Sequence, residues 1–165
     1  MPPNVLRSAA KLRVVNGSAR EARSALDESA ETCWTMQLNP RDNVHSATLK
    51  CKLAAPLSVS SLDALHGTFA GGFVPVRVVT LVGLEDAREK DGVRWVELAA
   101  SFPEDGNRRQ SFKDSSRGAR TEASPTFADA PAPPLASALA LRFEGSTDQF
   151  GRIVVYHLAV SSCEA

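Results

Sequence analysis

The sequence predicts an all-β protein in which two antiparallel sheets pack into a sandwich. Short runs of apolar and β-branched residues recur along the 165 residues, separated by Gly, Pro and Asn-Gly. No stretch places apolar residues at i, i+3, i+4 and i+7 through three turns, which is the spacing of an amphipathic helix. Long helical segments do not alternate with the strand-like runs, and this argues against a parallel α/β fold.

Six segments have the pattern of a strand: 12–15, 48–53, 76–82, 94–98, 139–143 and 153–160. The first ends at an Asn-Gly pair, a strong turn signal. The second alternates apolar residues with lysines, as a half-buried strand does, whereas the third is almost entirely apolar, which predicts a strand covered on both faces. A short helical turn is expected only at residues 19–26.

Two segments resemble surface insertions. Residues 83–92 are charged and are expected to connect two strands. Residues 114–134 are rich in Ser, Ala, Pro and Gly, so they bury too little apolar surface to offset the entropy of ordering them, and we expect a mobile loop. Too little chain follows this loop to fold alone, so residues 1–165 are expected to form one domain.

Charge and cysteine content restrict the function. Lys and Arg together number 19, as do Asp and Glu, and a net charge of zero argues against a general affinity for nucleic acid or an anionic membrane. No apolar run approaches the ~20 residues that span a bilayer, and no secretory signal is evident. The chain has three cysteines, Cys33, Cys51 and Cys163. An odd number favours a reducing compartment, so we expect the protein in the nucleus, the cytoplasm or both.

Two motifs carry a resemblance to a known family. Residues 26–34 (Leu-Asp-Glu-Ser-Ala-Glu-Thr-Cys-Trp) are similar to the acidic loop and tryptophan near the start of discoidin-like domains. Residues 147–158 (Thr-Asp-Gln-Phe-Gly-Arg-Ile-Val-Val-Tyr-His-Leu) resemble the C-terminal end of the nuclear-receptor-associated protein family. Shorter blocks between these motifs occur in the family's order, so the resemblance covers roughly residues 11–160 without the two insertions.

The resemblance implies a discoidin-like (galactose-binding-like) jelly roll with ligand-facing loops at one end. It also implies a protein partner, which would be either a nuclear receptor or the other subunits of a complex. A further implication is a role in repressing transcription. The sequence departs from the family at Ser29, where an acidic residue is usual, and at His45, near the place of a Trp. These departures weaken the prediction of a metal site more than the prediction of the fold.

A calcium site is the one cofactor that the sequence suggests. Asp27, Glu31 and Thr32 supply hard oxygen ligands in one tight loop, and several domains of this fold hold calcium there. The alternative, which we favour, is a capped turn in which Asp27 accepts backbone N–H groups and Thr32 satisfies a loop carbonyl.

Five residues are candidates for contact with a partner: Trp95, Glu104, Asp105, Asp148 and Arg152. Arg152 suits a forked contact to a carboxylate of the partner, or a structural pair with Asp148 or the acidic loop at 27–31. Trp95 suits recognition or packing at a sheet edge. Glu104 and Asp105 suit either a partner or a solvated turn.

Two structural expectations accompany these candidates. Gly151 is expected to have a positive φ at the turn before the last strand. Trp34 is expected to lie in the core.

Catalytic patterns are absent from the sequence. His45, His66 and His157 lack metal-site spacing, and neither a Gly-x-Ser-x-Gly elbow nor a phosphate loop occurs. Cys33 adjoins Trp34 and is therefore expected to be a buried, inert thiol. An enzyme and a small-molecule ligand are both disfavoured.

The leading interpretation is a non-enzymatic protein-binding module, a small subunit or adaptor of an intracellular complex. A carbohydrate-binding module is the main alternative, although aromatic residues make up only 6% of the chain. Further alternatives are a subunit of a ciliary or ubiquitin-ligase complex of the same fold, and a membrane-surface domain. Zero net charge disfavours the last of these.

Overall fold

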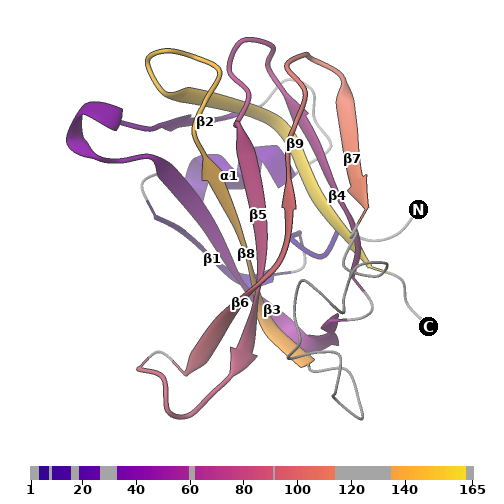
Figure 1. Cartoon of the computed structure of the whole chain (residues 1–165). Coiled ribbons are helices and arrows are strands. Elements are labelled where there is room, and N and C mark those ends of the chain that lie inside the picture. The colour runs from indigo at the N-terminus through magenta and orange to yellow at the C-terminus, as the bar shows by residue number, and fades with distance from the viewer. Residues whose placement is uncertain are drawn as a thin grey trace.

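The computed structural model describes residues 4–7, 9–15, 19–26, 33–59, 62–90, 92–113 and 135–162. They form two antiparallel sheets packed face to face, so the predicted all-β sandwich is confirmed (Figure 1). The five-stranded sheet has the order β1 (Ala9–Val15), β3 (Ser46–Ser58), β8 (Leu135–Glu144), β5 (Arg77–Glu85) and β6 (Val93–Ser101). The four-stranded sheet has the order β2 (Trp34–Gln37), β9 (Arg152–Ser162), β4 (Leu62–Phe69) and β7 (Arg109–Lys113).

Alternation of side chains decides which face of each strand enters the core. In β3, Leu49, Cys51 and Leu53 are buried between the sheets, whereas Lys50 and Lys52 point outward. In β5, every residue from 78 to 84 is buried, which confirms the prediction of a strand covered on both faces. Five of the six predicted strand segments lie wholly in observed strands. The sixth, 76–82, begins one residue too early, because β5 starts at Arg77 and Val76 is an exposed loop residue.

The core lies between the two sheets and contains the largest side chains. Trp34, Phe69 and Phe143 are each inaccessible to solvent. The rings of Trp34 and Phe143 meet edge to face, with centroids 5.6 Å apart and planes at 87°. The expectation that Trp34 is a core residue is therefore confirmed.

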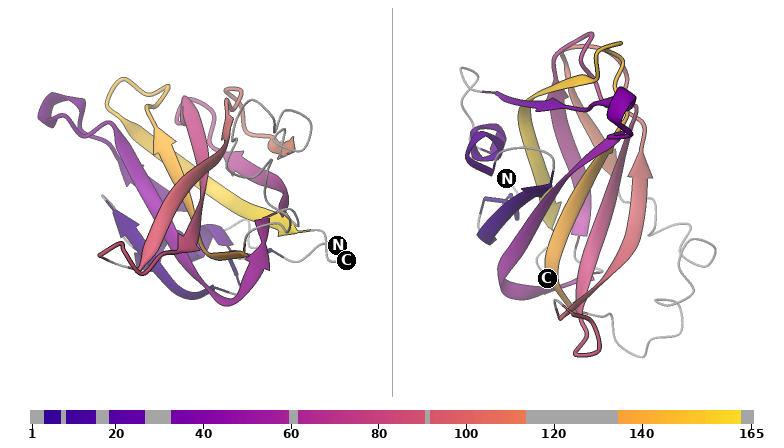
Figure 2. Two further views of the ribbon diagram at one scale, coloured as in Figure 1. Left: turned by 60° about the horizontal axis from the view of Figure 1, so that its bottom comes forward. Right: turned by 90° about the vertical axis from the view of Figure 1, so that its left-hand side faces the viewer.

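One side of the sandwich is closed by a short helix and the N-terminal segment. The helix α1 (Ala19–Leu26) is the helical turn that the sequence predicted. It buries Ala22, Ala25 and Leu26 and packs against β1, β2 and β9. In the right-hand view of Figure 2 it lies at the side of the sandwich, next to β1.

Two sequence expectations need correction. The charged insertion begins later than predicted, because residues 83–85 continue β5 and the turn is closed by Asp86 N–H donating to Gly92 O at 2.9 Å. Cys33 is exposed rather than buried, because Trp34 points into the core and its neighbour therefore points away. The inert thiol is that of Cys51, because burial raises the pKa of this thiol to about 12 and so disfavours the reactive thiolate.

Several expectations fall outside the described residues and stay predictions. These are the loop at 114–134, the Asn-Gly turn at 16–17, Cys163, and the calcium candidates Asp27, Glu31 and Thr32. Within the described ranges, no helix is long and apolar enough to cross a membrane.

Candidate functional site

Four loops lie at one end of the sandwich, three of them at the top of Figure 1 and the purple one at its upper left, and we call this region the loop end. They are residues 38–45, 70–76, 102–108 and 145–151, and the first contains the 3-10 helix η1 (Pro40–Asp42). Backbone hydrogen bonds join neighbouring loops. Leu38 N–H donates to Gly151 O at 2.8 Å, and Thr147 N–H donates to Val74 O at 2.9 Å. The loops therefore form one connected surface.

Arg152 is held at the centre of the loop end by three neighbours. Its Nε donates to Asp148 Oδ2 at 3.0 Å, and its backbone N–H donates to the same oxygen at 3.1 Å. The guanidinium lies 5.0 Å from the centroid of the Phe73 ring and 5.9 Å from that of Phe150, within the range of cation–π attraction. The predicted Asp148–Arg152 pair is confirmed, as is the positive φ of Gly151, at 80°.

The Asp148–Arg152 pair makes stability depend on acid pH. Burial raises the pKa of Asp148, but the hydrogen bonds from the Arg152 side chain and backbone and the positive charge outweigh it, so the pKa lies below its usual 3.8. A carboxyl with a lowered folded pKa stabilises the fold above its unfolded pKa, and this contribution is lost as the pH falls through the folded pKa. We therefore expect wild type to lose stability more steeply than Asp148→Asn as the pH falls from the unfolded pKa of this carboxyl through its folded pKa.

Denaturant melts at successive acidic pH values would measure this difference. Arg152→Gln should flatten the same part of the profile, because the carboxylate loses its partner. Equal slopes in wild type and both variants would contradict the assignment.

The loop at 102–108 supports the neighbouring glycine loop. Asp105 Oδ1 accepts from Gly72 N–H at 2.7 Å, and Asn107 Oδ1 accepts from Gly71 N–H at 2.6 Å. Glu104 forms an ion pair with Arg108. Asp105 thus has a structural role in the turn, and contact between Glu104 or Asp105 and a partner remains a prediction.

Exposed apolar side chains gather at the loop end. Among the described residues, five large apolar side chains are exposed, and three of them are here: Phe102 at 66%, Phe150 at 62% and Val76 at 52%. Sequence reasoning missed Phe102 and Phe150 as candidates because an aromatic residue is usually assigned to the core, and it placed Val76 in a strand covered on both faces. The available signal was their position next to turn residues, in Phe102-Pro103 and Phe150-Gly151.

Trp95 lies away from the loop end, on the outer face of the five-stranded sheet. It is half-buried against Val79, Leu81 and Ala140, and the Lys50 ammonium lies 5.7 Å from the centroid of its ring. This position favours the packing alternative. The structure therefore brings together four of the five candidate residues, all except Trp95.

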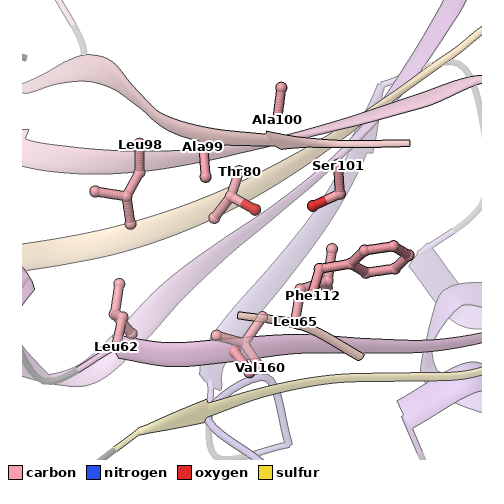
Figure 3. Close-up of a pocket in the computed structure, with 10 residues that line it drawn as sticks. Leu62, Leu65, Thr80, Leu98, Ala99, Ala100, Ser101, Phe112 and Val160 are labelled. Carbon is pink, nitrogen blue, oxygen red and sulfur yellow. The ribbon is translucent and has the colours of Figure 1, made fainter. Parts of the chain in front are cut away.

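A small cavity lies between the sheets beside the edge strands β6 and β7. Figure 3 shows the hydroxyls of Thr80 and Ser101 facing it among apolar side chains. Its volume is about 30 Å³, which suits one or two water molecules and no larger ligand. No group of three or more His, Cys, Asp and Glu side chains suited to a metal occurs in the part of the chain that the structure describes.

Curated relatives share one name. The chain is 33% identical over 134 residues to the nuclear receptor 2C2-associated protein of Xenopus laevis, covering 81% of this chain and 76% of the relative. It is 29% identical over 149 residues to the mouse protein of the same name, covering 89% and 84%. No protein-family model matches the chain.

Solved structures with the same architecture include carbohydrate-binding modules. The chitosan-binding module 1 of a Paenibacillus chitosanase/glucanase superposes with a TM-score of 0.61 at 11% identity, covering 96% of this chain and 98% of the module. The family 32 module of Clostridium perfringens NanJ, solved with galactose, superposes with a TM-score of 0.58 at 13% identity, covering 97% and 98%. These matches confirm the discoidin-like, galactose-binding-like fold. At such low identity they say nothing about the ligand of this chain.

Proposed function

Because this chain belongs to the nuclear receptor 2C2-associated protein family, we propose that it is a non-enzymatic module that binds a protein partner through its loop end. A nuclear receptor is the first partner to test, and the nucleus and cytoplasm are the compartments in which to test it. The names of the relatives support a protein partner. The observation that carries the proposal is the exposure of Phe102 and Phe150 on loops that are tied to their neighbours by hydrogen bonds.

Exposed aromatic rings suit a protein interface for two reasons. They offer a large contact area with few rotatable bonds, and residues that dominate interface energies are enriched in aromatic side chains and arginine. Arg152 adds a charged donor that Phe73 and Asp148 already orient. Its side chain therefore loses little conformational entropy when a partner binds.

The test compares two matched double variants by affinity capture from extract of the source cells, followed by titration of the purified partner. Phe102→Ala with Phe150→Ala removes the exposed rings, and we expect the dissociation constant to rise by tenfold or more, a loss of about 1.4 kcal/mol or more of binding free energy. Val15→Ala with Leu135→Ala removes exposed apolar side chains elsewhere and should leave binding unchanged. Equal binding by the two variants, or capture of no stoichiometric partner, would refute the proposal.

Carbohydrate binding is a second candidate because the loop end also offers the groups that hold a sugar. The Asp148–Arg152 pair supplies an acceptor and donors beside the exposed ring of Phe150, and solved relatives of the fold bind chitosan and galactose. Saturable binding on a glycan array that Phe150→Ala abolishes would favour this function over a protein partner.

A further inference from the structure

A second surface, distinct from the loop end, carries four cations on the outer face of the five-stranded sheet, three of them exposed. In the pairing of β1 with β3, Lys11 lies opposite Lys52 and Arg13 lies opposite Lys50. The alternate residues of both strands, such as Leu12 and Cys51, point toward the core, so the four cations share the outer face. We call these four residues the basic face.

No acidic partner neutralises the basic face among the residues that the structure describes. Two acids on the outer face of the same sheet, Glu97 and Glu144, are already engaged, because they hold Arg142 at 2.8 and 2.6 Å. Lys50 is half-buried and lies over the ring of Trp95, while Lys11, Arg13 and Lys52 are exposed. Like charges directly opposite each other destabilise a sheet, so the fold itself gains nothing from this arrangement.

The spacing of the basic face matches an extended peptide. Neighbouring strands lie about 4.8 Å apart, and residues i and i+2 of a strand lie about 6.8 Å apart on one face. Lys11 and Arg13 are such a pair, and so are Lys50 and Lys52. Alternate side chains of an extended partner have the same spacing, so two carboxylates separated by one residue can meet two cations of one strand.

We propose that the basic face binds an acidic, extended segment of another protein. Charge complementarity identifies this occupant, and the small extent of the face favours it over a polyphosphate chain. Zero net charge gives the molecule no long-range attraction for nucleic acid or an anionic bilayer. The four cations cover only two neighbouring strands, which is enough for a short acidic segment.

The test uses two triple variants of equal charge in the full chain. The first variant removes three of the four positive charges of the basic face and keeps the contact of Lys50 with Trp95; its substitutions are Lys11→Gln, Arg13→Gln and Lys52→Gln. Arg7→Gln, Lys90→Gln and Arg109→Gln remove three exposed cations from other parts of the surface. The probes are a labelled peptide of alternating Glu and Ser, a single-stranded oligonucleotide and phosphatidylserine vesicles.

We expect the peptide to bind wild type and the control, and to bind the basic-face variant about tenfold more weakly, the effect of losing three exposed ion contacts. Added salt should weaken the binding that remains. The melting temperature of the basic-face variant should equal or exceed that of wild type, because repulsion is removed.

Three results would overturn the proposal. The first is equal binding of the peptide by both variants. The second is tighter binding of the oligonucleotide or the vesicles than of the peptide. The third is a lower melting temperature of the basic-face variant, which would show that these cations serve the fold. The Phe102→Ala, Phe150→Ala variant should bind the peptide normally, so failure at the loop end and failure here can be distinguished.

Discussion

Trp34→Ala is expected to lower the free energy of unfolding by about 3–5 kcal/mol, a large part of the ~5–15 kcal/mol that stabilises a domain. Trp34 is inaccessible to solvent between the two sheets and meets Phe143 edge to face. Its removal leaves a cavity that rigid strands on both sides cannot fill. Urea denaturation followed by circular dichroism measures the loss.

Two further variants separate burial from the general effect of losing an aromatic ring. Trp95→Ala removes a half-buried tryptophan from the outer face of the sheet and should cost about 1–2 kcal/mol. Trp34→Phe should cost less than Trp34→Ala, because the ring is kept and the buried Trp34 Nε1 has no hydrogen-bond partner among the described residues. Similar losses for Trp34→Ala and Trp95→Ala would show that Trp34 is not central to the core.

The sequence predicted the strands whose side chains alternate strongly or are wholly apolar, and missed those where this signal is weak. The strand β2 has only four residues, and β4 is interrupted by Gly67. The strand β7 (Arg-Gln-Ser-Phe-Lys) is a polar edge strand that pairs with β4 alone. Which strands pair depends on contacts between distant residues, so neither sheet order nor register follows from local patterns.

Local chemistry made part of the loop end predictable. Asp148 and Arg152 are four residues apart across a glycine turn, so their pairing follows from the sequence. The support of Gly72 by Asp105 joins loops 33 residues apart and could not be predicted. The exposure of Phe102 and Phe150 was missed because the sequence shows that a ring is apolar but not whether the fold has room to bury it.

Gly151→Ala is the second substitution with a large expected effect, about 3–4 kcal/mol of destabilisation. A positive φ of 80° costs an L-residue with a side chain roughly 1–2 kcal/mol. A Cβ at this position would also lie 2.6 Å from the backbone oxygen of Leu38, closer than real Cβ contacts. That oxygen belongs to a segment fixed by the hydrogen bond from Leu38 N–H to Gly151 O, so relief of the clash must separate two loops.

Gly92→Ala is the matched control for this substitution. Its φ of 77° is nearly the same, but no atom lies within 4 Å of the added Cβ, so only the backbone cost of about 1–2 kcal/mol is expected. The difference between the two variants in chemical denaturation therefore measures the clash with Leu38. Because Gly151 N–H also donates to Asp148 O at 3.0 Å, Gly151→Ala should displace Arg152 and weaken binding at the loop end as well. Equal losses of stability in the two variants would mean that the loops move apart freely and that the loop end is not the firmly held surface on which partner binding depends.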